Sequence, residues 1–145
     1  AWVFSEYGNN FLKTMLQLGS VRDELSIVGD QIGCPTYAQD IAKAIVVIIP
    51  SLGLKKLDSG IFNYCGDQPC SWYEFAKAIF SVANSFGLKT PNIINSIKAA
   101  EYPTSAIRPA YSVLECSRIY NTFGITTSNW RHGIKRVLRE LYIKS

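Results

Sequence analysis

Residues 71–87 read SWYEFAKAIFSVANSFG and contain the clearest helix signal of the sequence. Ser71 and Glu74 have the spacing of a capping box, in which each side chain accepts a hydrogen bond from the other residue's backbone N–H. The apolar residues that follow are spaced by four, three and four, at Phe75, Ile79, Val82 and Phe86. Gly87 is suited to the left-handed C-cap that ends a helix. We therefore predict an amphipathic helix here, with one face on a core.

Two helices are predicted on the amino-terminal side of this segment. Apolar residues recur every three or four positions over residues 11–19, which indicates one short helix. Thr36 and Gln39 have the spacing of a second capping box, so the next helix is predicted to begin at Thr36 and to end at Pro50. The apolar face within residues 41–49 is wide, and we expect this helix to be largely buried.

The rest of the chain alternates short strands and helices. Strands are predicted at 25–28, 60–66 and 92–97, and helices at 116–123 and from about residue 130 to 141. Prolines make the connection over residues 99–111 irregular. The prediction is an α/β fold that is rich in helices and has a small sheet of a few short strands. No repeat or linker divides the chain, so residues 1–145 are expected to form one domain.

The composition is that of a globular protein. The chain has 145 residues, of which 48% are hydrophobic and 18% charged, and its mean hydropathy is +0.07. A net charge of +4 is small, and the basic face of Lys135, Arg136 and Arg139 lacks interleaved aromatic residues, so no nucleic-acid partner is expected. No apolar run is long enough to span a bilayer and no signal peptide is recognisable, so we expect no membrane partner and a cytoplasmic location. The opening at Ala1 resembles the inside of a strand, and we expect the chain to be a piece of a longer protein.

Several catalytic patterns are absent from the sequence. There is neither a GxGxxG nor a P-loop motif, and the single histidine, His132, has no nucleophile motif near it. The four cysteines form no CxxC pair, and we expect reduced, mostly buried thiols and no metal site.

Three segments could bind a ligand. The loop Asp30–Thr36 leads into a predicted helix N-terminus, which favours an anion such as a phosphate, although a plain strand-to-helix connection is an equal alternative. Arg108, restricted by Pro109, suits bidentate recognition of a phosphate, but a lone arginine is more often a surface charge. Trp2 could belong to the core or offer a flat face to a sugar ring.

Together these segments resemble one family. The residues that carry the resemblance occur in this order: Trp2-Val3-Phe4, Gly8-Asn9-Asn10-Phe11 with Met15, Asp30-Gln31 with Gly33 and Pro35-Thr36, Ser71 to Ala76, Tyr102-Pro103-Thr104, and Arg108-Pro109. The chain is similar to the carboxy-terminal part of the dTDP-4-dehydrorhamnose reductase family, which belongs to the extended short-chain dehydrogenases/reductases. The resemblance implies the substrate-binding lobe of a Rossmann-type enzyme that reduces the 4-keto group of a dTDP-linked sugar with NADPH or NADH, the last step of dTDP-L-rhamnose synthesis.

The resemblance also implies a role for individual residues. The substrate-binding positions are Trp2 as a wall of the sugar pocket, Asn10 and Phe11 at a helix start facing the diphosphate, Gln31, Pro35 and Thr36 in the substrate loop, and Arg108 on the diphosphate. No catalytic or cofactor-binding residue and no complete Mg²⁺ site is expected in this chain. A homodimer could form through the terminal helix or through residues 41–49.

The family's glycine-rich loop and catalytic Tyr-x-x-x-Lys pair precede the part of the family that this chain resembles. Tyr73 and Lys77 have the same spacing, but they lie in the predicted amphipathic helix, so we do not interpret them as that pair. We expect the chain alone to be inactive. An alternative stays open, in which the parent is a non-catalytic homologue that regulates or scaffolds a partner enzyme, because the residues that would distinguish the two lie upstream.

Overall fold

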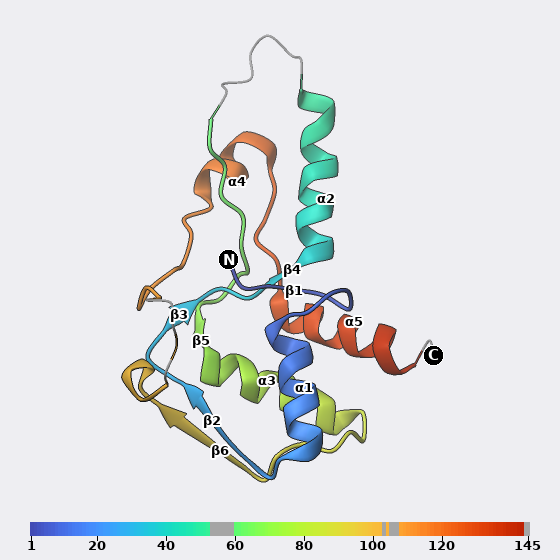
Figure 1. The fold of residues 1–145 in the computed structure, drawn as a ribbon. Helices are drawn as coiled ribbons and strands as arrows, with labels where there is room; N and C mark the ends of the chain where they lie inside the picture. The colour runs from blue at the N-terminus through green and yellow to red at the C-terminus, as the bar shows by residue number, and fades with distance from the viewer. Residues whose placement is uncertain (53–59, 103, 105–107, 144–145) are drawn as a thin grey trace.

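The computed structural model describes residues 1–52, 60–102, 104 and 108–143 (Figure 1). The helices are α1 (Phe11–Val21), α2 (Ala38–Ile48), α3 (Trp72–Ser85), α4 (Ser117–Phe123) and α5 (Trp130–Tyr142), with 3-10 turns η1 (Ile49–Ser51) and η2 (Ala99–Glu101). The strands are β1 (Val3–Phe4), β2 (Glu24–Val28), β3 (Ile32–Gly33), β4 (Thr36–Tyr37), β5 (Cys70–Ser71) and β6 (Ile93–Ile97). This confirms the predicted helix-rich α/β fold with a few short strands.

The strands pair two by two instead of forming the one small sheet that was predicted. Within the described ranges, β1 lies parallel to β4, β2 parallel to β6, and β3 antiparallel to β5. The longest pair runs from Glu24 opposite Ile93 to Val28 opposite Ile97. The prediction of a strand at 60–66 was wrong, because only Gly66 pairs there, in an isolated bridge to Ser128.

The core is centred on α3, as its sequence predicted. Ser71 Oγ accepts from Glu74 N at 3.1 Å and Glu74 Oε2 accepts from Ser71 N at 2.7 Å, which confirms the capping box. Gly87, with φ at 73°, follows the helix end in the left-handed conformation. One cluster of buried side chains joins α3 to α1, α5, β1, β2 and β4, and its largest members are Trp130, Tyr37, Phe4 and Phe75. In Figure 1, α1, α3 and α5 lie together around this core, above the β2–β6 pair.

The predicted capping box at Thr36 and Gln39 is not formed. Thr36 is part of β4, and its hydroxyl donates to the carbonyl oxygens of Ala1 and Cys34, both at 3.1 Å. The N-cap of α2 is Tyr37, whose side chain makes no capping hydrogen bond. The correction has a physical reason: Thr36 is fully buried, and its hydroxyl satisfies buried backbone carbonyls instead of a helix N–H.

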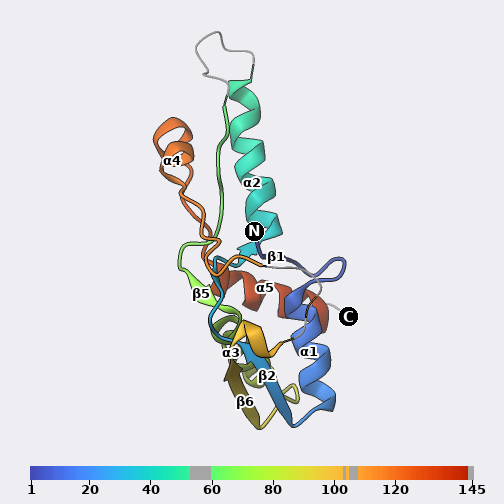
Figure 2. The same ribbon diagram turned by 60° about the vertical axis from the view of Figure 1, so that its left-hand side comes forward.

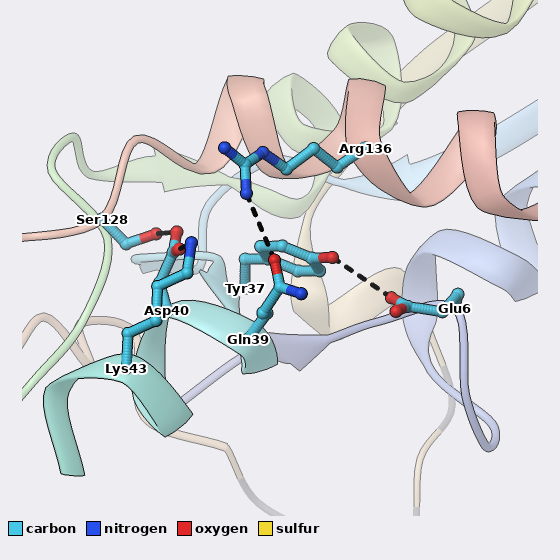
Figure 3. A network of polar contacts seen from close by, with 7 residues as sticks. All are labelled: Glu6, Tyr37, Gln39, Asp40, Lys43, Ser128 and Arg136. Atoms are coloured by element: carbon cyan, nitrogen blue, oxygen red, sulfur yellow. Dashed lines mark hydrogen bonds and ion pairs between the residues drawn. The ribbon is translucent and has the colours of Figure 1, made fainter. Parts of the chain in front are cut away.

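A set of polar contacts fixes the start of α2 instead (Figure 3). Ser128 Oγ donates to Asp40 Oδ2 at 2.6 Å, and Asp40 lies in the first turn of α2. Arg136 of α5 donates to the Gln39 amide oxygen at 3.2 Å. The Tyr37 hydroxyl points to the Glu6 carboxylate at 3.4 Å. These contacts tie α2 to α5 and to the segment that leads into α5.

Helix α2 is not largely buried, which corrects the second prediction about it. Ala44 is its only fully buried residue, and the exposed apolar side chains are Ile45, Val46 and Val47, followed by Ile49. In both ribbon views α2 extends away from the body formed by α1, α3 and α5 (Figure 2). The apolar periodicity was real, but of the face that it describes only Ala44 is fully buried, while Ile41 and Ile48 are half-buried and Ile45 and Ile49 are exposed. None of the helices in the described parts of the chain combines the length and apolarity needed to cross a membrane.

Candidate functional site

An open groove of ≈ 720 Å³ lies between α1, β2 and the segment that follows β6. One face of α1 lines it with Phe11, Met15 and Leu18, at successive turns of the helix. Strand β2 contributes the next wall, and Gln31 lies just beyond the end of that strand. The volume and the mixture of an apolar lining with a few polar groups are typical of a small-molecule site.

The groove brings together three of the predicted site residues, Phe11, Gln31 and Arg108. They come from the first turn of α1, the loop after β2 and the segment after η2, which are far apart in sequence. The prediction that these three side chains contact a sugar nucleotide stays a prediction. All three line the same groove, as contact with one common ligand would require.

Trp2 does not line the groove itself but packs against Trp72, which does. Its indole stacks on Trp72 with the ring centroids 3.5 Å apart and the planes 13° apart, and Trp72 in turn packs on Phe11 at 4.6 Å. Trp72 and Phe11 line the groove directly. Trp2 therefore supports the aromatic wall in this structure, and its predicted contact with the sugar remains untested.

The backbone at Trp2 adopts an unusual conformation. Its φ of 53° lies in the left-handed region, which a bulky residue rarely adopts and which stores strain. Gly33 makes this arrangement fit, because a Cβ at Gly33 would lie 2.5 Å from the Trp2 ring. The Trp2 carbonyl also accepts a hydrogen bond from Thr36 N at 3.1 Å. The strained backbone at Trp2 thus places its indole between Gly33 and Trp72.

The charged groups of the groove are arginines and glutamates. Arg22 and Arg108 line it together with Glu24 and Glu101. Glu24 accepts from the Asn95 amide at 2.7 Å, and Glu101 accepts from the backbone N–H of Lys98 at 2.9 Å. Arg22 and Arg108 are both exposed, and the ion pairs found in the described ranges join other residues.

Asn10 is separated from the groove although it is adjacent to Phe11. Its side chain caps α1 by accepting from Lys13 N at 3.2 Å, and its amide donates to the Ser5 carbonyl at 2.8 Å. It lines a different hollow, of ≈ 370 Å³, on the opposite face of α1. The structure thus gives Asn10 a capping function, and its predicted contact with a diphosphate stays a prediction.

Pro35 and Thr36 also lie outside the groove. Both side chains are fully buried. The Pro35 carbonyl lies so close to Gly66 that a Cβ there would approach its oxygen to 2.1 Å. In this structure Pro35 and Thr36 pack in the interior and fix the path of the chain between Gln31 and α2.

Sequence reasoning did not place Trp72 or Arg22 in the site. Trp72 belongs to the motif Ser71 to Ala76 that supported the family resemblance, and this was the signal that could have identified it. Arg22 follows the helical series of Phe11, Met15 and Leu18 by one more turn. A helical projection of α1 that continued past its predicted end would have placed it on the same face.

Tyr73 and Lys77 lie on α3, as predicted. The Lys77 ammonium lies over the Tyr73 ring, 5.4 Å from its centroid. Such a contact between a cation and an aromatic ring is a common surface interaction on a helix.

The described residues do not fit a nicotinamide dinucleotide site. Such a site needs a parallel sheet with a glycine-rich turn into a helix, whereas the parallel strands described here occur only as two isolated pairs, and the sequence contains no GxGxxG. Within the same ranges, no group of three or more histidine, cysteine or carboxylate side chains is arranged to hold a metal ion.

Comparison with known proteins identifies the family. The chain matches the family model described as the RmlD substrate binding domain over residues 1–143. It is 44% identical over 140 residues to dTDP-4-dehydrorhamnose reductase from Aggregatibacter actinomycetemcomitans, covering 94% of this chain and 47% of that protein. It is 39% identical over 140 residues to the spore coat polysaccharide biosynthesis protein SpsK of Bacillus subtilis, covering 97% of this chain and 45% of that protein.

Solved structures agree with the sequence relatives. The dTDP-4-dehydrorhamnose reductase of Bacillus anthracis in complex with NADP superposes with a TM-score of 0.81 at 37% identity, over 96% of this chain and 46% of that one. The orthologue from Clostridium acetobutylicum gives a TM-score of 0.83 at 34% identity, and the match covers 97% of this chain and 46% of that one. The dTDP-glucose 4,6-dehydratase of Bacillus anthracis, at 13% identity and a TM-score of 0.69, shares the fold.

The chain spans about half the length of the curated relatives that it matches. The predicted fold class is confirmed, since the structural relatives are Rossmann-like reductases and the matched part is the α/β substrate-binding region. With a family match over almost its whole length, the chain belongs to the RmlD substrate binding domain family.

Proposed function

We propose that this chain is the substrate-binding lobe of an NADPH-dependent dTDP-4-dehydrorhamnose reductase, and that the groove beside α1 binds the dTDP-linked 4-keto sugar. One observation carries the proposal: the groove gathers Phe11, Gln31 and Arg108, three residues that the family resemblance assigns to substrate from separate parts of the sequence. The names of the relatives support the substrate class.

The chemistry of the groove suits such a ligand. A nucleotide diphosphate carries about two negative charges, and a guanidinium group can bind phosphate oxygens through two parallel hydrogen bonds. Arg108 is exposed at the groove, and Arg22 lines the same groove. The apolar side chains of Met15 and Leu18 offer a surface for a base or the face of a sugar ring.

The chain contributes position and orientation to the proposed reaction. Holding the 4-keto sugar in one geometry raises the rate of any subsequent step by removing translational and rotational freedom. NADPH binding and proton transfer belong, in this proposal, to the rest of the full-length protein, and the lack of a GxGxxG motif in this sequence supports that division. A cytoplasmic location is part of the same proposal.

The test is the steady-state kinetics of the full-length protein with the dTDP-linked 4-keto sugar and NADPH. Arg108→Ala should lower kcat/KM by about 10- to 100-fold, because a hydrogen bond to a charged group contributes about 1.5–3 kcal/mol. The kcat/KM of Arg108→Lys should lie between those of the wild type and Arg108→Ala, since lysine keeps the charge but loses the bidentate geometry. The matched control is Arg139→Ala, an exposed arginine of α5 that does not line the groove.

Direct binding measurements test whether Arg108 contacts the nucleotide and whether the full-length protein is an enzyme or a non-catalytic homologue. Calorimetry with dTDP should show weaker binding to Arg108→Ala and unchanged binding to the control. Wild-type kcat/KM in Arg108→Ala would contradict the assignment of the groove. Binding of the sugar nucleotide without turnover by the full-length wild type would instead favour a non-catalytic homologue.

A further inference from the structure

Two cysteines lie against each other on the side of the molecule that carries α4, away from the groove. The Sγ atoms of Cys65 and Cys116 are 3.6 Å apart, although 51 positions separate them in the sequence. Both belong to a group of free cysteines. Neither residue takes part in the groove or in the family motifs that predicted it.

The backbone on both sides holds these two sulfurs in place. The Asn63 amide donates to the Glu115 carbonyl at 3.2 Å, and the Cys65 thiol lies 3.5 Å from the Leu114 carbonyl. Residues 63–65 and 114–116 therefore run next to each other. The segment 63–65 makes a further hydrogen bond, in which Ser128 N donates to the Cys65 carbonyl at 3.3 Å.

The separation is close to that of a disulfide bond. A disulfide has its sulfurs about 2.05 Å apart, so the two atoms need to approach by about 1.5 Å. Rotation about the side-chain bonds supplies movements of this size. The Asn63 side chain and the Cys65 thiol both contact backbone carbonyls of residues 114–115, so the two segments lie within side-chain reach of each other.

One of the two thiols is accessible to a small molecule. Cys65 and Cys116 both line a hollow of ≈ 690 Å³ that opens to solvent, but Cys116 is half-buried whereas Cys65 is only 3% exposed. Cys34, which also lines this hollow, is likewise 3% exposed. Burial raises the pKa of Cys116 to about 11, so its thiolate fraction, and with it the rate of oxidation, should increase as the pH rises towards 11.

We propose that Cys65 and Cys116 form an oxidisable thiol pair that a hydroperoxide converts into a disulfide. The Cys116 thiolate attacks the outer oxygen of the hydroperoxide, the O–O bond breaks, and an alcohol or water leaves, which gives a sulfenic acid on Cys116. The Cys65 thiol then attacks the Cys116 sulfur, the S–O bond breaks and water leaves. Two thiols lose two hydrogens and two electrons, and the hydroperoxide accepts them.

The disulfide would link the start of α4 to the segment that leads into β5. The same hollow is lined by Cys34, which follows β3 and lies three residues after Gln31. Oxidation therefore adds a covalent connection next to the predicted substrate loop. The proposal does not depend on the ligand of the groove.

Peptide mapping of the full-length protein tests the proposal. The folded protein is titrated with hydrogen peroxide and then unfolded in guanidinium chloride, where all free thiols are blocked with N-ethylmaleimide. The protein is then digested with trypsin without reduction. The sequence then predicts a linked pair of the peptides 57–77 and 99–118, with loss of maleimide from one cysteine in each. Cys70 lies in the same peptide as Cys65, so Cys70→Ser is the matched control and should leave the linkage unchanged.

A trapping experiment tests the order of the two steps. In Cys65→Ser the sulfenic acid has no partner, so dimedone should label Cys116, whereas the wild type should show little label. In Cys116→Ser the link between peptides 57–77 and 99–118 should be lost. A dominant link to the peptide 23–43, which carries Cys34, or full maleimide labelling of Cys65 and Cys116 after oxidation, would overturn the proposal.

Discussion

Gly33→Ala should disturb the aromatic wall of the groove without touching a groove residue. An added Cβ would lie 2.5, 2.8 and 2.8 Å from atoms of the Trp2 indole. Ordinary carbon contacts are about 3.5–4.0 Å, so the ring must move by about 1 Å. Because Trp2 stacks on Trp72 at 3.5 Å, this movement separates the two indoles.

Two opposing effects decide the size of the change. Replacing glycine by alanine in a compatible extended backbone stabilises a protein by about 0.4–1 kcal/mol. Overpacking costs about 1–3 kcal/mol, and a lost aromatic pair about 0.5–1.5 kcal/mol. The steric effect wins, and Gly33→Ala should lower the free energy of unfolding by about 2 kcal/mol. In a Trp2→Ala background the obstacle is absent, so the same substitution should stabilise the protein by about 0.5 kcal/mol.

Urea unfolding of the four proteins in this double-mutant cycle measures the two values, and circular dichroism reports the stacked indole pair. The pair should give an exciton signal in the wild type that is weakened in Gly33→Ala. A change of sign between the two backgrounds is the diagnostic result. Equal destabilisation in both backgrounds would refute the reasoning, because the loss would then not come from Trp2.

Three further predictions concern stability. Ser71→Ala should lower the free energy of unfolding by about 1 kcal/mol, because one N–H of α3 loses its cap, and urea denaturation measures it. Gly133→Ala should destabilise despite a better helix propensity, since its Cβ would lie 2.8 Å from the Tyr37 Cβ; a gain in melting temperature would contradict this. Burial raises the pKa of Cys70 from 9.0 to about 12, so the fold favours the protonated thiol, and its contribution should be complete below pH 9 and lost as the pH rises towards 12. Denaturation across this range should show a smaller loss in Cys70→Ser.

Local signals in the sequence predicted the elements whose partners are also local. The capping box of Ser71 and the left-handed Gly87 depend only on neighbouring residues, and both are present. Thr36 has an equally good local pattern, but its hydroxyl bonds to Ala1, 35 positions away. A residue pattern within one turn contains no information about a distant carbonyl that competes for the Thr36 hydroxyl. The helix was therefore predicted to begin two residues too early.

The site shows the same division between local and distant information. The sequence placed Phe11, Gln31 and Arg108 in one site through a family resemblance, and the structure brings them to one groove. The resemblance also named Asn10, which is adjacent to Phe11 in sequence but lies on the other face of α1, and the binding role of all four residues stays a prediction. Helical geometry separates Asn10 from Phe11, because neighbours along a helix point about 100° apart.

Helix α2 shows what periodicity can and cannot determine. Its apolar residues recur at helical spacing, and this correctly predicted a helix. The spacing specifies that one face is apolar, but burial requires a second surface of matching shape, which is a property of the whole fold. Ala44 meets such a surface and is buried, whereas Ile45 and Ile49, on the same apolar face, are more than half exposed. Amphipathicity therefore reports the existence of a face, and only the three-dimensional arrangement shows which part of that face is covered.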